Sequence, residues 1–267
     1  MNNLASRILV ALVGLPVVLG LVWLGGWWLF ALLTVAALVG VHEFVQMARP
    51  LRPLAPAAYA GAVLALVGAR TGGVVWMLGG FLATFVLGFL LNALARTRAP
   101  STAAIGSTVL GAAWIGLGLG HLLLLRQMHT EPRLLAFAVL LTVWGADTLA
   151  YAGGRLLGRR KLAPRLSPGK TWEGFVIGSL AGVFVSFVAL YDSRGHYLQI
   201  WQAVVLGVAV VLAAVVGDLF ESALKRDMEV KDTGRLLGGH GGVLDRVDAL
   251  LFAGAAAYYL VLAFGYH

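Results

Sequence analysis

The stretch QIWQAVVLGVAVVLAAVVGDLF, residues 199–220, carries one charged residue, Asp218. An α-helix needs about 20 mostly apolar residues to cross the hydrocarbon core of a membrane. We therefore expect this stretch to form a transmembrane helix, and comparable apolar stretches recur along the whole chain.

The composition of the chain supports the same interpretation. Of the 267 residues, 60% are hydrophobic and 12% are charged, whereas about 25% are charged in ordinary soluble domains. A soluble fold would need more charge to cover its surface. The chain has no cysteine, which excludes disulfides and thiolate metal sites. The composition predicts an all-α, polytopic integral membrane protein.

Charges, prolines and glycine clusters divide the chain into nine apolar segments. We interpret the first as a retained span, since no clear small-residue cleavage site follows it. We expect a single transmembrane catalytic domain over residues 1–267, with N-terminal helices at about 1–98 and the active site within about 134–267. The nine expected spans are 8–24, 27–47, 54–69, 73–94, 103–125, 134–157, 171–191, 199–220 and 249–265.

The basic residues agree with nine spans. Lys and Arg concentrate in the cytoplasmic loops of membrane proteins, and this division places all but four of the 20 Lys and Arg residues on one side. We therefore expect a cytoplasmic N-terminus, an external C-terminus and polar loops at the cytoplasmic face of the inner membrane. Contact with anionic head groups explains the net charge of +8 without a nucleic-acid partner. The four exceptions are Arg70, Arg126, Arg133 and Arg194.

The last span is preceded by a charged stretch, residues 218–248. Four of its side chains follow the spacing i, i+3, i+4, i+7, which places them on one helix face. They are Asp218, Glu221, Ser222 and Lys225. Asp245 and Asp248 lie one helical turn apart and offer oxygen ligands that suit Mg²⁺. The glycine-rich run 238–242 would let a ligand approach the backbone closely. The alternative is a charged loop with salt bridges and an acidic helix N-terminus.

A second polar patch covers residues 147–174. Asp147 lies within an apolar segment, where a carboxylate suggests a functional role, and Tyr151 follows one turn later. We expect both to point into a cavity. Ser167 and Pro168 are expected to begin a helix, whose free amides could face a phosphate together with Lys170. A P-loop is excluded because Pro164 stands where that motif requires glycine and we expect no preceding strand. The alternative is a capped helix start beside a basic loop.

Glu43, near the inner end of the second span, has two interpretations. It is either a charge at a helix end that reaches toward water or a supporting partner in a polar site between helices. The sequence leaves both open.

The stretch 218–248 combines acidic and basic side chains, and the chain has no cysteine. These residues favour a hard metal cation with oxygen ligands. Together with a membrane boundary, they point to phosphoryl or nucleotidyl transfer involving a lipid. Ion-coupled transport is the competing class, since carboxylates within a membrane also mark ion paths.

The charged stretch carries the pattern Ser222-x-Leu224-Lys225-Arg226-x4-Lys231-Asp232-x-Gly234-x2-Leu237-Gly238-x-His240-Gly241-Gly242-Val243-x-Asp245-Arg246-Val247-Asp248. This pattern resembles the C-terminal motif of the phosphatidate cytidylyltransferases, also called CDP-diacylglycerol synthases, and the 147–174 patch is similar to their second shared region. One departure is Gly238, where many members have proline.

The resemblance implies a Mg²⁺-dependent reaction of CTP with phosphatidate that gives CDP-diacylglycerol and diphosphate. A second cation and a homodimer are left open. The rival functions are a CTP-dependent lipid kinase and an ion-coupled transporter.

We assign hypothetical roles on this basis. The metal ligands would be Asp218 and Asp245, with Asp248 and Glu221, and Lys225 would act in catalysis. His240 would either donate a proton to the leaving group or anchor its loop. The expected substrate-binding residues are Ser167, Lys170, Ser222, Arg226, Lys231, Arg246, Asp147 and Tyr151.

Overall fold

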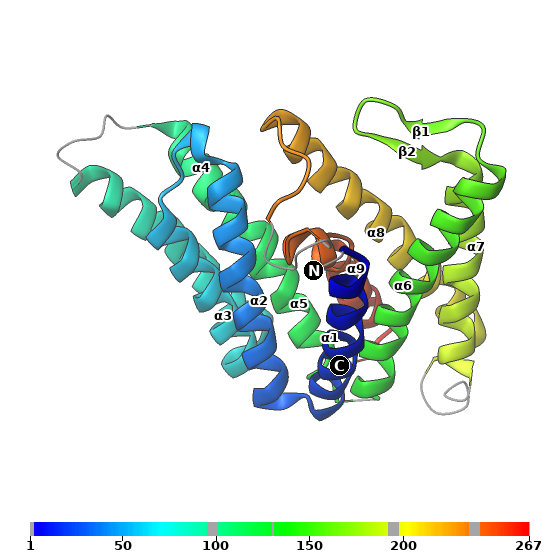
Figure 1. Cartoon of the computed structure of the whole chain (residues 1–267). Coiled ribbons are helices and arrows are strands. Elements are labelled where there is room, and N and C mark those ends of the chain that lie inside the picture. Colours follow the sequence, from blue (N-terminus) through cyan, green and yellow to red (C-terminus); the bar gives the residue numbers. More distant parts are fainter. Residues whose placement is uncertain (1–2, 95–100, 130, 192–197, 235–240, 267) are drawn as a thin grey trace. The chain divides into compact units, whose positions relative to one another are not determined.

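The computed structural model describes residues 3–94, 101–129, 131–191, 198–234 and 241–266 (Figure 1). These residues form helices and one short two-stranded sheet, arranged as two compact units. The first unit comprises Met1–Leu124 and Asp227–Val247, and the second comprises Leu125–Arg226 and Asp248–His267. The expectation of a single catalytic domain stays a prediction.

The helices confirm the all-α, multi-pass membrane class. Among the described residues, seven helices are long and apolar enough to cross a membrane. One of them, α3 (Ala55–Leu94), has non-helical backbone at Gly72 and Gly73, where we expected the spans 54–69 and 73–94 to separate. The count of nine spans and the sides of the two termini stay predictions.

In the first unit, glycines shape the connections between helices. Gly25, between the first two helices, has a φ of 65°, which glycine adopts without steric cost. Ser101 begins the helix after residue 100 by accepting a hydrogen bond from the Ala104 amide (3.3 Å). The elements are α1 (Asn3–Leu24), α2 (Gly26–Met47), the 3₁₀ turn η1 (Arg49–Leu51), α3, α4 (Thr102–Gly111), the π-helix η2 (Ala112–Leu117) and α5 (Gly118–Leu125).

Small residues let α2, α3 and η2 pack closely in this unit. A Cβ at Gly116 would lie 2.8 Å from Ala62 Cα, and one at Gly111 would lie 2.6 Å from the Phe44 ring. Phe44 and Ile115 are fully buried at this contact. Apolar burial with close backbone approach therefore holds α2, which carries Glu43, in place.

The second unit is built from four long helices and one hairpin. Thr171 caps α7 by accepting a hydrogen bond from the Gly174 amide (3.1 Å). The last helix starts in the first unit, which contains residues up to Val247, and continues through the second. The elements are α6 (Pro132–Leu157), β1 (Lys161–Ala163), β2 (Ser167–Thr171), α7 (Trp172–Ala189), α8 (Ile200–Asp227) and α9 (Leu244–Ala263).

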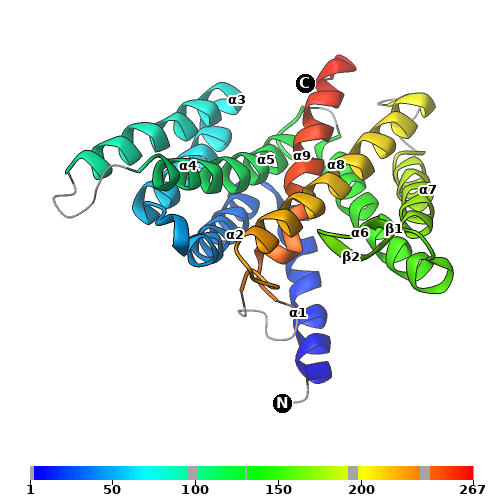
Figure 2. The same ribbon diagram turned by 90° about the horizontal axis from the view of Figure 1, so that it is seen from above.

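Helices α6 and α7 lie side by side (Figures 1 and 2). Buried glycines recur every four residues along α7, at Gly174, Gly178 and Gly182. A Cβ at Gly178 would lie 2.6 Å from both the Ala146 carbonyl oxygen and Ala150 Cβ. The two backbones can approach this closely only because no side chain separates them.

We predict that Gly178→Leu destabilises the protein, because the new side chain cannot fit against α6. Overpacking of this kind costs about 1–3 kcal/mol, so the unfolding temperature in detergent should fall by several degrees. The control is Gly79→Leu, on an exposed face of α3 with nothing within 4 Å of the added Cβ. Equal unfolding temperatures for the two variants would contradict the packing argument.

Candidate active site

Residues 161–171 form a β-hairpin, which contradicts the helix start that we expected at Ser167 and Pro168. The strands pair antiparallel, with Lys161 opposite Thr171 and Ala163 opposite Ser167. Helix α7 begins only at Trp172. The expectation that no strand precedes the Gly169-Lys170-Thr171 run was also wrong, since β1 does. Lys170 therefore lies on a strand and not at a helix terminus.

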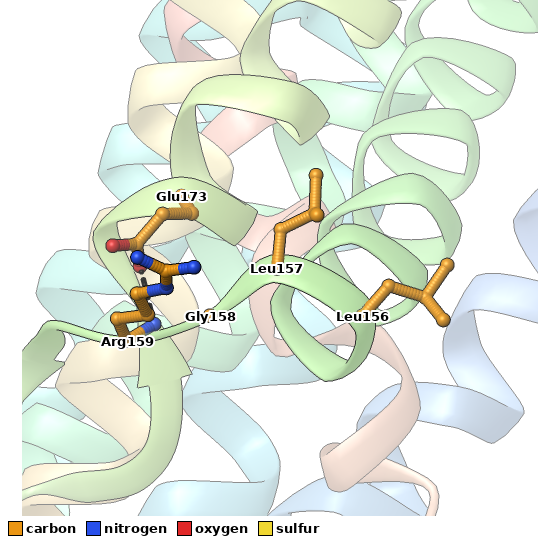
Figure 3. Close-up of a pocket in the computed structure, with 5 residues that line it drawn as sticks. All are labelled: Leu156, Leu157, Gly158, Arg159 and Glu173. Carbon is orange, nitrogen blue, oxygen red and sulfur yellow. Dashed lines mark hydrogen bonds between the residues drawn. The ribbon is translucent and has the colours of Figure 1, made fainter.

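Glu173, in the first turn of α7, fixes the base of the hairpin. Its carboxylate accepts hydrogen bonds from the backbone amides of Arg159 (3.0 Å) and Arg160 (3.2 Å), and the Trp172 amide donates to the Arg160 carbonyl (2.9 Å). The turn borders an open pocket of about 390 Å³ (Figure 3). The pocket is lined by Leu156, Leu157, Gly158, Arg159 and Glu173.

The polar face predicted on α8 is confirmed. The Ser222 hydroxyl donates to Asp218 Oδ1 (3.4 Å), and Lys225 Nζ lies 2.8 Å from Glu221 Oε2. Both pairs are one turn apart, so the four side chains share one face. The Glu221 side chain is 1% exposed, and pairing with Lys225 offsets the cost of burying its charge.

Two contacts attach the hairpin to this face of α8. Lys170 Nζ forms an ion pair with Asp218 Oδ2 at 2.6 Å, and Arg226 Nε donates to the Leu166 carbonyl at 3.2 Å. Ser167 lies on the same strand as Lys170. Within the second unit, the two polar patches of the sequence therefore meet.

Asp248 joins the carboxylates of α8. Its side chain is 8% exposed and lies within hydrogen-bonding reach of Glu221, and Asp218 also acts on it electrostatically. Over the described part of the chain, no three His, Cys, Asp or Glu side chains are grouped closely enough to hold a metal ion. Asp218 and Glu221 are instead paired with lysines. Their role as metal ligands stays a prediction.

In the first unit, two carboxylates accept hydrogen bonds from residues at the start of α9 and before it. Glu43 accepts hydrogen bonds from the amides of Val243 (3.0 Å) and Leu244 (2.8 Å). Asp245 Oδ2 accepts from the amides of Thr233 (3.1 Å) and Gly242 (2.8 Å). The interpretation of Glu43 as a charge reaching toward water is wrong, and the supporting-partner alternative is the one that its contacts favour.

Asp147 and Tyr151 lie on the surface of the second unit. Both lie on α6 and both are exposed, Tyr151 to 69%, because this face of α6 is turned away from its contact with α7. The Tyr151 hydroxyl accepts a hydrogen bond from Arg155 (3.2 Å). The cavity expected beside these two residues and their role in substrate binding both stay predictions.

The remaining candidates are less constrained. Lys231 and Arg246 are exposed, and their contacts with phosphate stay predictions. His240 and most of the glycine run 238–242 lie outside the described residues.

Sequence reasoning missed Glu173 and Thr233. Glu173 could have been found from its place two residues after the capping Thr171, where an acidic side chain favours a helix start. No local signal identifies Thr233, since its contacts reach Asp245 and Glu43 far along the chain.

Comparison with known proteins gives the same family as the 222–248 motif. A family model described as the cytidylyltransferase family matches residues 5–264. The chain is 38% identical to a phosphatidate cytidylyltransferase of Pseudomonas aeruginosa over 265 residues, with 94% of each chain covered.

Two other relatives of the same name are similar over nearly their full length. The protein of Synechocystis sp. is 32% identical, with 96% of each chain covered. The protein of Brucella abortus is 36% identical, with 97% of this chain and 93% of that protein covered. The resemblance seen in the sequence is therefore confirmed, and the chain belongs to the cytidylyltransferase family.

Proposed function

We propose that this protein transfers the cytidylyl group of CTP to phosphatidate, giving CDP-diacylglycerol and diphosphate, and so acts in phospholipid biosynthesis. The observation that carries the proposal is the ion pair between Lys170 and Asp218 in a chain of this family. This ion pair joins Lys170, from the 147–174 patch, to Asp218, from the 218–248 stretch. Asp218 lies on α8, one of the helices that are long and apolar enough to cross a membrane.

The chemistry of the substrates explains why both signs of charge are needed. CTP and phosphatidate bring several negative charges together, so the barrier to reaction is largely electrostatic and positional. Lys170, Lys225 and Arg226 lie on or beside one face of α8. We assign them to the phosphates, where their charges would offset the repulsion between the substrates.

The donor set of the second unit fits Mg²⁺. Mg²⁺ is usually held by one or two carboxylates together with substrate phosphates and water, so a preformed cage of protein ligands is not required. Asp218 is the first candidate, with Glu221 and Asp248 beside it. When bound, Mg²⁺ would neutralise charge on the CTP phosphates. Asp245 and a second cation stay sequence-based candidates.

The two ion pairs between lysines and carboxylates suggest how the site accepts its substrates. Lys170 and Lys225 now neutralise carboxylates. Binding of CTP with its cation would let these lysines turn to phosphate oxygens while the carboxylates face the cation. The charges of these two lysines and of Asp218 and Glu221 would stay paired throughout, and pairing offsets the cost of burying a charge such as that of Glu221.

Nucleotidyl transfer then needs no strong general base. The second pKa of a phosphomonoester is about 6, so the phosphatidate oxygen is largely ionised near neutral pH. That oxygen forms a bond to the α-phosphorus of CTP, the bond between the α-phosphorus and its bridging oxygen breaks, and diphosphate leaves with the electron pair. The protein residues position the two reactants in line.

We place this site at the cytoplasmic face of the inner membrane. The basic residues of the hairpin and of the two positions before it support this side, since Lys and Arg concentrate in cytoplasmic loops. They include Arg159, Arg160, Lys161 and Arg165, all exposed. CTP is available on this side.

Labelled CTP tests the reaction. We predict that purified protein with phosphatidate and Mg²⁺ moves label from α-³²P-CTP, but not from γ-³²P-CTP, into chloroform-soluble lipid. Transfer of the γ label would instead show a CTP-dependent lipid kinase. Ion flux in liposomes without nucleotide turnover would show a transporter.

Asp218 is the sharpest test of the cation assignment. We predict that Asp218→Asn lowers activity by about 100-fold, the order expected when a charged group acting on the transition state is removed. The Mg²⁺ concentration for half-maximal activity should also rise. The control is Asp227→Asn, an exposed carboxylate at the end of the same helix. Near-normal activity of Asp218→Asn at low Mg²⁺ would rule out the assignment.

Lys170 is predicted to act on phosphate from the hairpin. Lys170→Met keeps the length of the side chain and removes its charge, so we expect kcat/KM for CTP to fall about tenfold, equivalent to about 1.4 kcal/mol. Lys161→Met, an exposed lysine on the partner strand, should change it less than about twofold, because surface charges contribute little. Equal effects of the two substitutions would argue against a specific role for Lys170.

A further inference from the structure

Glu43 is a buried carboxylate, and no basic side chain among the described residues forms an ion pair with it. It lies on α2 and is 4% exposed. Burying a carboxylate costs several kcal/mol unless hydrogen bonds or charges compensate it. The hydrogen-bond donors around Glu43 must therefore compensate the cost of its burial.

The compensation comes from the start of α9. Glu43 Oε1 accepts from the Val243 amide at 3.0 Å, and Oε2 accepts from the Leu244 amide at 2.8 Å. The first amides of a helix have no partner within the helix, and the helix N-terminus carries partial positive charge. Glu43 thus caps α9 from a position about 200 residues earlier in the chain.

Thr233 links this cap to Asp245. Its hydroxyl lies 3.0 Å from Asp245 Oδ2 and 3.4 Å from Glu43 Oε2. A hydroxyl has one hydrogen to donate, so the shorter contact to Asp245 is the better bond. The Thr233 amide also donates to Asp245 Oδ2 at 3.1 Å. One residue therefore adjoins both carboxylates.

The loop backbone fits tightly around Glu43. A Cβ on Gly234 would lie 2.5 Å from Glu43 Oε1, and a Cβ on Gly242 would lie 2.5 Å from Oε2. Only glycine lets the backbone approach the carboxylate this closely at both points. Gly234 and Gly242 thus both lie directly against the Glu43 carboxylate.

We propose that Glu43 is a positioning residue for the reaction: it fixes the first turn of α9 and the residues around Thr233, and thereby orients the carboxylate of Asp245. This inference rests on the proposed function, in which Asp245 is a candidate cation ligand. Glu43 itself touches no substrate. Groups that orient a metal ligand typically change metal affinity or activity by about 10–100-fold when they are replaced.

The test compares Glu43→Gln with the wild-type chain in the same detergent. Glutamine keeps the shape but has one acceptor oxygen, and its NH₂ group would face an amide that also donates. We expect the Mg²⁺ concentration for half-maximal activity to rise about tenfold. The Mg²⁺ concentration at which CTP raises the unfolding temperature should rise equally, which provides a readout apart from turnover.

A third readout reports on the backbone near Thr233 alone. Trypsin should cleave the Glu43→Gln protein after Lys231 faster than the wild type, because Thr233 and Gly234 are held less firmly against residue 43. The matched control is His42→Gln, the neighbouring exposed residue, whose Nδ1 is hydrogen bonded with the Tyr59 hydroxyl (3.0 Å). His42→Gln should match the wild type in all three measurements.

Thr233→Val is the second variant, and it tests the positioning role if Glu43→Gln does not fold. It keeps the side-chain shape, removes the hydroxyl next to both carboxylates and should raise the Mg²⁺ requirement in both measurements. A folded Glu43→Gln protein with lower turnover but wild-type Mg²⁺ midpoints would overturn the positioning role. Wild-type protein without cytidylyl transfer would overturn the proposed function instead, and faster trypsin cleavage of Glu43→Gln would still establish the cap.

Discussion

Pairing of buried charge is the constraint on which the rest of this structure depends. The chain is 60% hydrophobic, and a carboxylate among such residues is tolerated only when a cation or several hydrogen-bond donors compensate it. The two units meet this constraint differently. In the second unit, lysines pair with Asp218 and Glu221, whereas in the first unit, backbone amides surround Glu43 and Asp245.

The difference has a functional meaning. A lysine is mobile and can exchange a carboxylate for a phosphate, so the pairs on α8 suit a surface where charged substrates arrive and leave. Backbone amides at a helix start are fixed, so they suit a carboxylate whose orientation must not change. We therefore assign α8 and the hairpin to binding the charged substrates, and Glu43 to holding the carboxylate of Asp245 in position.

Close backbone approach is the second requirement, and glycine supplies it. Gly174 and Gly178 bring α7 against α6, and the hairpin that carries Lys170 leads directly into α7. Gly234 and Gly242 similarly bring the backbone onto Glu43. In both units, glycines therefore help to set where the charged side chains of the proposed site stand.

The sequence by itself determined the features that depend on local periodicity. Apolar length predicted the membrane helices, the i, i+3, i+4, i+7 spacing predicted the face of α8, and the charged motif identified the family. Tertiary structure decided the features that depend on distant partners. Residues 161–171 form a hairpin where Ser167 and Pro168 suggested a helix start, because pairing of the two strands and the contacts with Asp218 and Arg226 outweigh local preference. Glu43 caps a helix about 200 residues away, and no periodicity within α2 could reveal a partner that only folding brings near.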